Sequence, residues 1–371
     1  MNEEFIPFSF GFFESPEDYR DIPLQAVISD ETNLPEEFEL NIEQLPNWNQ
    51  KQIGSCIGHA SAKGKQVLEL KETGKVIPLS PRFIYALCKS QDGLPYEGTF
   101  YRMAGKVLMD YGCATEMTVP NNSDLTHAEY INLKNIPPSA YKEAKQYAIK
   151  GYVYVNPFNL DSLKRGIMAG GVLLGMKLDN NWWTNKEGMR SYKAEDILPL
   201  RVPKQILGGH AVFAYKWDKF EGRDRIWIVN SFGDKWGING NGYFMWDEYS
   251  SFKQGDANGL IEGWSYIDLP NDWIKEVKDL PPAQFFKYNF VKDIEKGQTS
   301  EDVRNLQIAL KILKIFPATQ KETGYYGSIT QKAVLDFQYK YQVASVAEIR
   351  HVNGLRVGPK TRKKLNELFN K

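Results

Sequence analysis

The spacing of apolar residues changes near the middle of this 371-residue chain. In the first half they recur at helical intervals, which predicts helices over Cys56–Leu70, Ser80–Lys89 and Phe100–Tyr111. After residue 150, short runs rich in β-branched and aromatic residues predict strands over Gly151–Asn156, Val172–Leu178, Ala211–Trp217 and Arg225–Asn230. A helical half followed by a strand-rich half predicts an α+β fold.

The last two predicted strands are separated by a charged segment that contains a glycine, Asp218–Asp224, which predicts a hairpin. The two strands of a hairpin run antiparallel, so the beginning of the first and the end of the second lie at the same end of the sheet. His210 directly precedes the first strand and Asn230 ends the second. We therefore expect these two side chains to lie close together.

Charge divides the chain into unequal parts. The 46 basic and 46 acidic residues cancel overall, but residues 1–50 carry a net charge of −11 and residues 291–371 carry +7. We predict an acidic N-terminal arm over residues 1–45 and a main domain over residues 46–270. A linker with two consecutive prolines follows over residues 271–289, and a small helical domain over residues 290–371.

Several classes of protein are excluded by simple counts. Three cysteines that lie far apart, with no C-x-x-C pair, predict neither a disulfide framework nor a structural zinc site. No apolar run approaches the 18 residues that a membrane span needs, and the acidic first ten residues are not a secretory leader. We expect no cofactor, and no nucleic-acid binding, because the main domain lacks a basic stripe interleaved with aromatic residues.

One of the three cysteines stands where a reactive thiol is expected. Cys56 opens a predicted helix, and the free N–H groups at a helix N-terminus stabilise a thiolate. A nucleophilic thiol also needs a base, and His210 is the best placed of the four histidines because the amide oxygen of Asn230 can orient its ring. His59 is the alternative base; His127 and His351 are expected to be structural or exposed.

Four blocks of the main domain, in order, resemble the papain-like cysteine peptidases. They are Asn49-Gln50, Gly54-Ser55-Cys56, His210-Ala211, and Asn230-Ser231-Phe232-Gly233 followed by Trp236-Gly237 and Gly240–Tyr243. The resemblance implies a fold of two subdomains, one helical and one resembling a β-barrel, with the substrate cleft between them.

The same resemblance implies roles for individual residues. Cys56 would be the nucleophile, His210 the general acid–base, and Asn230 the residue that orients it. Gln50 would donate to the oxyanion beside the backbone N–H of Cys56. For substrate binding, Gly54 would lie in the cleft wall and Gly209 would leave an open pocket floor.

The chain departs from the family pattern at three positions. Ile53 stands where a half-cystine is usual, Ile57 replaces the aromatic residue after the nucleophile, and Phe232 replaces the tryptophan that shields the His–Asn hydrogen bond. These changes resemble divergent bacterial or phage-encoded members. They concern side-chain specificity more than catalysis. The acidic arm is expected to pack on the main domain, and the alternative is that it plugs the cleft.

The last 80 or so residues resemble a peptidoglycan-binding domain of the three-helix type. The residues that carry the resemblance are Gly297, Asp302-Val303, Leu306-Gln307, Leu310, Thr323-Gly324, Gly327, Thr330, Ala333-Val334, Phe337-Gln338, Val357-Gly358-Pro359, Thr361 and Leu365. The resemblance implies attachment to peptidoglycan or another wall polymer, and the +7 charge suits an anionic wall. A module that only packs or binds protein is the alternative.

Together these expectations describe a cysteine endopeptidase that hydrolyses protein or peptide bonds through a thioester and is targeted to the cell wall by its last domain. One alternative is a lysin that cuts the peptide crosslinks of peptidoglycan. Another is a catalytically idle wall-binding adhesin. The expected place of action is the bacterial cell wall or the extracellular space, after release by lysis or delivery with a phage.

Overall fold

The computed structural model describes residues 10–16, 18, 21–27, 33–179, 182, 200–254, 257–267, 288–313, 315–317, 320 and 322–369. They form two units, one that holds residues 10–16 with 22–267 and one that holds residues 288–369. Most of the predicted linker, residues 271–287, lies outside the described residues. No described helix combines the length and the apolar character that crossing a bilayer requires.

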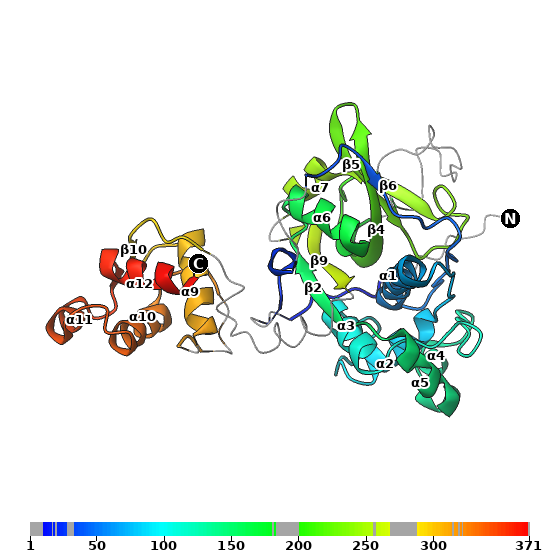
Figure 1. Cartoon of the computed structure of the whole chain (residues 1–371), viewed down its shortest axis with the longest axis horizontal. Coiled ribbons are helices and arrows are strands. Elements are labelled where there is room, and N and C mark those ends of the chain that lie inside the picture. Colours follow the sequence, from blue (N-terminus) through cyan, green and yellow to red (C-terminus); the bar gives the residue numbers. More distant parts are fainter. Residues whose placement is uncertain are drawn as a thin grey trace. The chain divides into compact units, whose positions relative to one another are not determined.

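The predicted helices of the first unit are all present. They are α1 (Cys56–Thr73), α2 (Pro81–Lys89) and α3 (Tyr101–Asp110), followed by the shorter α4 (His127–Tyr130), the 3₁₀ turn η2 (Leu133–Asn135), α5 (Pro138–Ala144) and the 3₁₀ turn η3 (Lys145–Tyr147). Ser80 begins α2, because its side chain accepts the backbone N–H of Phe83 at 3.1 Å. Gly74 ends α1 in the left-handed conformation, with φ 67°. Figure 1 shows α2 to α5 gathered on one side of α1.

The strands of the first unit form one antiparallel sheet. Its members are β1 (Phe38–Glu39), β2 (Gly151–Val155), β3 (Val172–Leu178), β4 (Gly208–Phe220), β5 (Arg223–Val229), β6 (Asn241–Met245) and β9 (Leu260–Ile267). Their order is β2-β9-β3-β4-β5-β6, and β1 also pairs with β4. Among the described residues β2 and β6 do not pair with each other, so the sheet is open and the expected barrel-like half is not a closed barrel.

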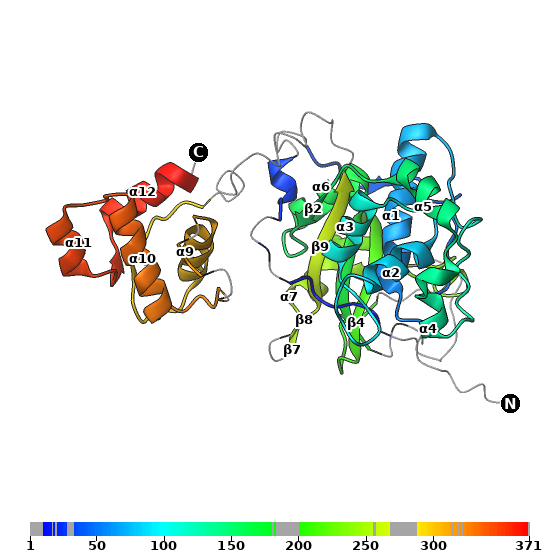
Figure 2. The same ribbon diagram turned by 90° about the horizontal axis from the view of Figure 1, so that it is seen from below.

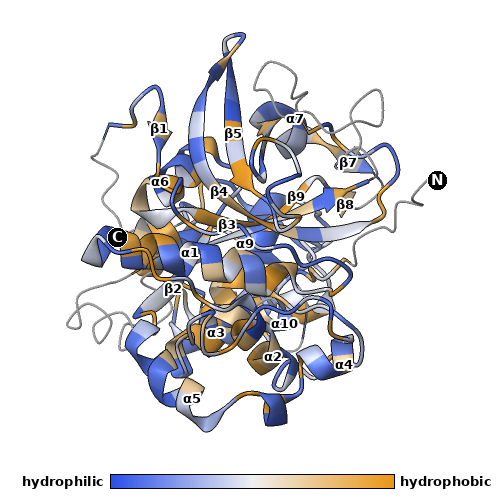
Figure 3. Cartoon of the chain, turned by 90° about the vertical axis from the view of Figure 1, so that its right-hand side faces the viewer, coloured by the Kyte–Doolittle hydropathy of each residue, from blue (hydrophilic) through white to orange (hydrophobic). Residues whose placement is uncertain are grey.

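The predicted hairpin is formed by β4 and β5, with a tighter turn than expected. The strands pair as far as Phe220 and Arg223, so only Glu221 and Gly222 form the turn. Both have positive φ, 52° and 75°, which suits the right-handed twist of the paired strands. Figure 3 shows the tip of this hairpin as hydrophilic.

Helix α1 joins the helical part to the sheet. It packs against α2 and α3 and also against β3, β4 and β9, and Figure 2 shows it beside β4 and β9. Gly64 faces the sheet, and an added β-carbon there would lie in ordinary contact, 3.4 Å from the rings of Phe213 and Tyr266. The Tyr266 hydroxyl donates to Oγ of Ser61 at 2.8 Å. The inner strands of the sheet therefore support the helix that begins at Cys56.

The remaining elements of the first unit cover the edges of the sheet. Helix α6 (Leu160–Gly170) packs against β2, β4 and β9 and against the 3₁₀ turn η1 (Leu24–Ala26). Helix α7 (Trp246–Ser251) follows β6, and β7 (Lys253–Gln254) pairs with β8 (Ala257–Asn258). The described part of the N-terminal arm packs on this unit, as expected, through Leu24, which is fully buried, and through β1.

In its described residues the second unit has four helices, one more than the three-helix type implies. They are α9 (Glu301–Ile312), α10 (Ser328–Lys340), the extra α11 (Val346–Val352) and α12 (Pro359–Phe369), with a two-stranded ribbon of β10 (Ile294–Glu295) and β11 (Arg356–Val357). Its separate core contains apolar residues that carry the resemblance to a peptidoglycan-binding domain: Val303, Leu306, Leu310, Val334, Phe337 and Leu365.

One kind of side-chain hydrogen bond occurs twice in the second unit. Nε2 of Gln307 in α9 donates to Oγ1 of Thr330 in α10 at 2.9 Å. In the same way, Nε2 of Gln338 in α10 donates to Oγ1 of Thr361 in α12 at 3.1 Å. Each glutamine thus binds the first turn of a later helix, α10 or α12, and all four side chains are buried.

Candidate active site

Cys56 is the first residue of α1 and is fully buried. Burial raises the pKa of its thiol to about 11, and hydrogen bonds from the backbone of Ala211, Gly11 and Ile57 oppose this shift. The lowered thiol pKa that its place at a helix N-terminus predicts is therefore not found in this state of the protein. Removing water from around a thiolate destabilises it by more than the helix N-terminus stabilises it.

His210, on β4, and Asn230, just after β5, meet as the hairpin predicts. Nε2 of His210 lies 2.7 Å from Oδ1 of Asn230. The same Oδ1 accepts the backbone N–H of Ser231 at 2.8 Å, which identifies it as the amide oxygen. Nε2 must then donate the proton of the His–Asn hydrogen bond. This leaves Nδ1, which is buried and has no hydrogen-bond partner in the described part of the chain, as the basic ring nitrogen.

Aromatic rings enclose the imidazole of His210. Phe232 lies against it with ring centroids 4.9 Å apart, and Trp182 meets it edge-on at 5.7 Å. Phe232 thus takes the shielding position expected of it. Burial lowers the pKa of His210 to about 4, and the hydrogen bond that its ring donates to Asn230 opposes this shift. The imidazole and the Cys56 thiol are therefore both neutral near pH 7 in this state.

Gln50 connects the start of α1 to the segment after β5. Its Nε2 donates to the carbonyl of Ile53 at 2.9 Å, and its Oε1 accepts the hydroxyl of Ser231. Its backbone N–H also donates to the carbonyl of Ser231 at 2.8 Å. The side chain is fully buried. The structure therefore places Gln50 between the segments that carry Cys56 and Asn230.

The other histidines have partners of their own. Nδ1 of His59 lies 2.9 Å from the carbonyl of Ser55 and its Nε2 lies 3.2 Å from Nδ2 of Asn121, so both ring nitrogens are engaged away from the thiol. His127 begins α4 and bonds the hydroxyl of Tyr85 at 3.1 Å. His351 lies in α11 of the second unit.

The N-terminal arm runs directly over Cys56, which the sequence allowed only as an alternative. Gly11 packs on Gly54, and an added β-carbon at Gly11 would lie 1.9 Å from the Gly54 carbonyl oxygen. Backbone hydrogen bonds join the arm to Thr99: its N–H donates to the Gly11 carbonyl at 3.0 Å and its carbonyl accepts the N–H of Phe13 at 2.9 Å. Gly54 and Gly209, the two residues expected to bind substrate, both touch this segment, Gly209 through Phe12.

The buried side chain of Glu262 binds the arm a second time, at Ser15. Oε1 of Glu262 accepts both the N–H of Ser15 at 3.2 Å and its hydroxyl at 3.0 Å. Oε2 accepts the indole N–H of Trp264 at 2.9 Å. Burial raises the pKa of Glu262 to about 7, against the hydrogen bonds from Trp264 and Ser15. Sequence patterns gave no sign of this contact.

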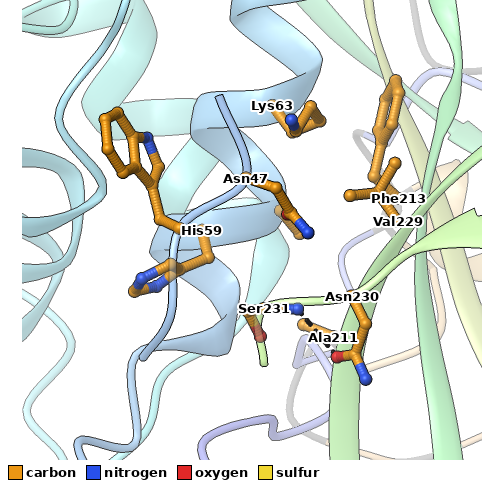
Figure 4. Close-up of a pocket in the computed structure, with 10 residues that line it drawn as sticks. Asn47, His59, Lys63, Ala211, Phe213, Val229, Asn230 and Ser231 are labelled. Atoms are coloured by element: carbon orange, nitrogen blue, oxygen red, sulfur yellow. Dashed lines mark hydrogen bonds between the residues drawn. The ribbon is translucent and has the colours of Figure 1, made fainter. Parts of the chain in front are cut away.

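A small pocket borders Asn230 on the side of α1 (Figure 4). It is lined by Asn47, Trp48, His59, Ala60, Lys63, Ala211, Phe213, Val229, Asn230 and Ser231. Nζ of Lys63 is buried there and donates to the carbonyls of Pro46 and Leu45. Burial lowers the pKa of Lys63 to about 7, with Asp234 opposing the shift. Lys63 is a second buried titratable group that sequence reasoning did not single out.

Cys88 and Cys113 are buried, free cysteines. Burial raises the pKa of both thiols well above the ordinary value. Within the described ranges, no group of three histidine, cysteine, aspartate or glutamate side chains could hold a metal ion. The described residues therefore offer a buried thiol at Cys56 and, at His210, an imidazole oriented by an amide oxygen.

Comparison with known proteins matches both units. The sequence profile of the papain family cysteine proteases matches residues 34–256, and that of a peptidoglycan binding domain matches residues 299–345. An uncharacterized peptidase C1-like protein of Acanthamoeba polyphaga mimivirus is 25% identical over 281 residues, which cover 65% of this chain and 82% of that protein.

Solved structures share the fold of the first unit. Xylellain, a cysteine protease from Xylella fastidiosa, aligns with a TM-score of 0.57 and 24% identity over 71% of this chain and 97% of its own. Digestive procathepsin L 3 of Tenebrio molitor larval midgut aligns with a TM-score of 0.50 and 15% identity, over 67% and 76% of the two chains. The family profile spans more than half of the sequence, so the chain belongs to the papain family of cysteine proteases and carries a peptidoglycan-binding domain.

Proposed function

We propose that this protein is an endopeptidase in which Cys56 attacks the peptide carbonyl, His210 transfers the proton and Asn230 orients His210. The observation that carries the proposal is the hydrogen bond between Nε2 of His210 and Oδ1 of Asn230. It leaves Nδ1 as the proton acceptor for a thiol that belongs to a cysteine-protease family.

The reaction divides into two steps. The proton of the Cys56 thiol moves to Nδ1 of His210 as sulfur bonds to the carbonyl carbon, and the same proton then passes to the leaving amine as the C–N bond breaks. Water, deprotonated by His210, hydrolyses the thioester and releases the acid. Gln50 and the backbone N–H of Cys56 are the proposed donors to the oxyanion.

The chemistry is tested with the purified full-length protein. We expect it to hydrolyse denatured casein and short chromogenic peptides, and the Cys56→Ala variant to be inactive. Cys88→Ala is the matched control, since Cys88 is an equally buried thiol without a histidine partner. An active Cys56→Ala variant would contradict the assignment.

We propose further that residues 290–371 form a domain that attaches the enzyme to cell wall, with residues 271–289 as its linker and residues 46–270 as the peptidase domain behind the 1–45 arm. The match to a peptidoglycan binding domain and the +7 charge of residues 291–371 support this division. A chain that ends near Pro282 should keep peptide hydrolysis and lose co-sedimentation with purified peptidoglycan. Co-sedimentation of the intact chain should weaken at high salt, because salt screens the charge.

The peptidoglycan binding domain also favours a second candidate function, cleavage of the peptide crosslinks of the wall itself. Release of soluble muropeptides from purified wall by the wild-type protein, and not by Cys56→Ala, would establish this lysin activity. Wall binding by a wild-type protein that hydrolyses no peptide would instead indicate an idle adhesin.

A further inference from the structure

The segment over Cys56 is held at three consecutive residues by glycines of the main unit. Phe10 packs on Gly208, Gly11 on Gly54, and Phe12 on Gly175 and Gly209. These four glycines together with Thr99, which forms the backbone hydrogen bonds, are called the arm site.

The ring of Phe12 lies where a side chain at Gly175 or at Gly209 would otherwise lie. A β-carbon added at Gly175 would lie 2.1 Å from Cζ of Phe12, and one at Gly209 would lie 2.8 Å from its Cδ1. The ring of Tyr101 closes the third side, 5.6 Å away between centroids. Phe12 is only 5% exposed. The position therefore accepts a flat aromatic ring and buries it almost completely.

The middle residue can only be glycine. A β-carbon at Gly11 would lie 1.9 Å from the carbonyl oxygen of Gly54 and 2.3 Å from its carbon, so backbone would meet backbone with no side chain able to move aside. The hydrogen bond from Thr99 to the Gly11 carbonyl fixes this approach. The arm site thus excludes every other residue at its centre.

Phe10 packs on the arm site in the same way as Phe12. A β-carbon added at Gly208 would lie 2.6 Å from Cγ of Phe10, so this ring also rests on bare backbone. The neighbouring Phe13 lies outside the arm site, because its ring lies against Gly98 and against Tyr96, which is 55% exposed, and not against the glycines of β3 and β4.

We propose that the arm site recognises peptides of the sequence aromatic–glycine–aromatic, and that substrates carrying this sequence bind where Phe10, Gly11 and Phe12 lie. The inference rests on the proposed function, because it takes the surface over Cys56 to be the substrate site. The arm then occupies the substrate site as a ligand, and its sequence indicates the specificity of the enzyme. That specificity is for two aromatic residues, whose rings pack on glycine backbone, with a glycine between them.

The experiment measures binding without hydrolysis. The full-length Cys56→Ala protein also carries Phe12→Ala, which weakens the hold of its own arm, and fluorescence anisotropy follows a labelled peptide with the sequence of residues 9–15. Competing peptides contain Phe-Gly-Phe, Phe-Ala-Phe, Ala-Gly-Phe or Phe-Gly-Ala at the centre. We expect each of the last three to bind about tenfold or more weakly than the first, through overlap with Gly54 or loss of one buried ring.

A matched pair of protein variants locates the effect. Gly175→Val should weaken binding of the Phe-Gly-Phe peptide and leave that of Phe-Gly-Ala unchanged, whereas Phe13→Ala, added to the same protein, should alter neither. If Gly175→Val does not fold, the four peptides alone decide. Equal affinities across the peptide series, or tight binding of Phe-Ala-Phe, would overturn the proposal.

The two proposals fail separately. Selective binding by the Cys56→Ala protein, with no hydrolysis by the protein that retains Cys56, would leave recognition intact and reject the endopeptidase. Hydrolysis by the protein that retains Cys56, with no binding preference among the four peptides, would reject the recognition proposal and leave the endopeptidase proposal intact.

Discussion

Nε2 of His210 lies 2.7 Å from Oδ1 of Asn230. The acceptor is an amide oxygen and cannot take up a proton, so it selects the tautomer of the imidazole and stays neutral itself. Ser231 fixes the amide by donating its backbone N–H to the same oxygen. The geometry of the pair is thus set by the backbone after β5 as well as by the side chains.

This pair predicts the order of losses on mutation. Cys56→Ala and His210→Ala should each lower kcat/KM for a short peptide by about 10⁴-fold or more, because nucleophile and base act as a unit. Circular dichroism and the unfolding temperature should confirm that both variants fold. Substantial activity in His210→Ala, or inactivity of His59→Ala, would transfer the role of base to His59.

Asn230→Ala should be less severe. Loss of one orienting hydrogen bond, worth about 1.5–3 kcal/mol, predicts about a 10- to 100-fold fall in kcat/KM. Asn132→Ala is a suitable control, since this asparagine also accepts a backbone N–H, from Lys134 at 3.0 Å, but lies far from Cys56 in the sequence and caps a 3₁₀ turn. Equal effects of the two changes would mean that Asn230 acts only on stability.

The cover over Cys56 can be displaced by one methyl group. In Gly11→Ala the new β-carbon meets the Gly54 carbonyl, so we expect the arm to lift and iodoacetamide to alkylate Cys56 at least about tenfold faster at pH 7. In Gly358→Ala the new carbon would have its nearest neighbour 3.8 Å away, and the rate should not change. Equal alkylation rates in the wild type and Gly11→Ala would show that the arm does not limit access.

The carboxyl group of Glu262 should make stability depend on pH. Its pKa is raised to about 7 in the folded protein from 4.5, so the folded state holds its proton more tightly than the unfolded chain. The stability that this proton contributes is complete below about pH 4.5 and is lost as the pH rises to about 7. The unfolding temperature of the wild type should therefore fall over this range relative to that of Glu262→Gln. Glu221→Gln, at the exposed hairpin turn, should follow the wild type.

The three thiols should behave differently. Cys88 and Cys113 are buried with raised pKa values, so mass spectrometry of the native Gly11→Ala protein should find one alkylated cysteine, Cys56. A reducing agent should raise peptidase activity, by reversing oxidation of Cys56, and leave the unfolding temperature unchanged. A lower unfolding temperature on reduction would reveal a disulfide.

Local pattern was enough to predict the start of α1 at Cys56 and the meeting of His210 with Asn230, because a helix boundary and a hairpin depend on residues close in sequence. The shielding ring of Phe232 was implied by the resemblance to the papain-like peptidases and not by local pattern. The path of the arm could not be predicted, since it depends on Gly175, Gly208 and Gly209 leaving room for two rings. The sequence-based prediction of a lowered thiol pKa for Cys56 was wrong for the same reason. The helix N-terminus can be recognised in the sequence, whereas the arm that excludes water from the thiol cannot.

The hydrogen bonds between Ser15 and Glu262 join residues 247 positions apart. During synthesis the ribosome makes the arm early and the strand that anchors it, β9, about 250 residues later. At about 5–20 residues per second, that delay is on the order of ten seconds or more. The contact is among the most nonlocal in the unit, and such contacts close late because of the loop entropy they cost. We therefore expect the anchor of the arm at Glu262 to form late in folding, so the order of folding events, and not only the finished structure, affects how long a newborn chain exposes the reactive sulfur of Cys56.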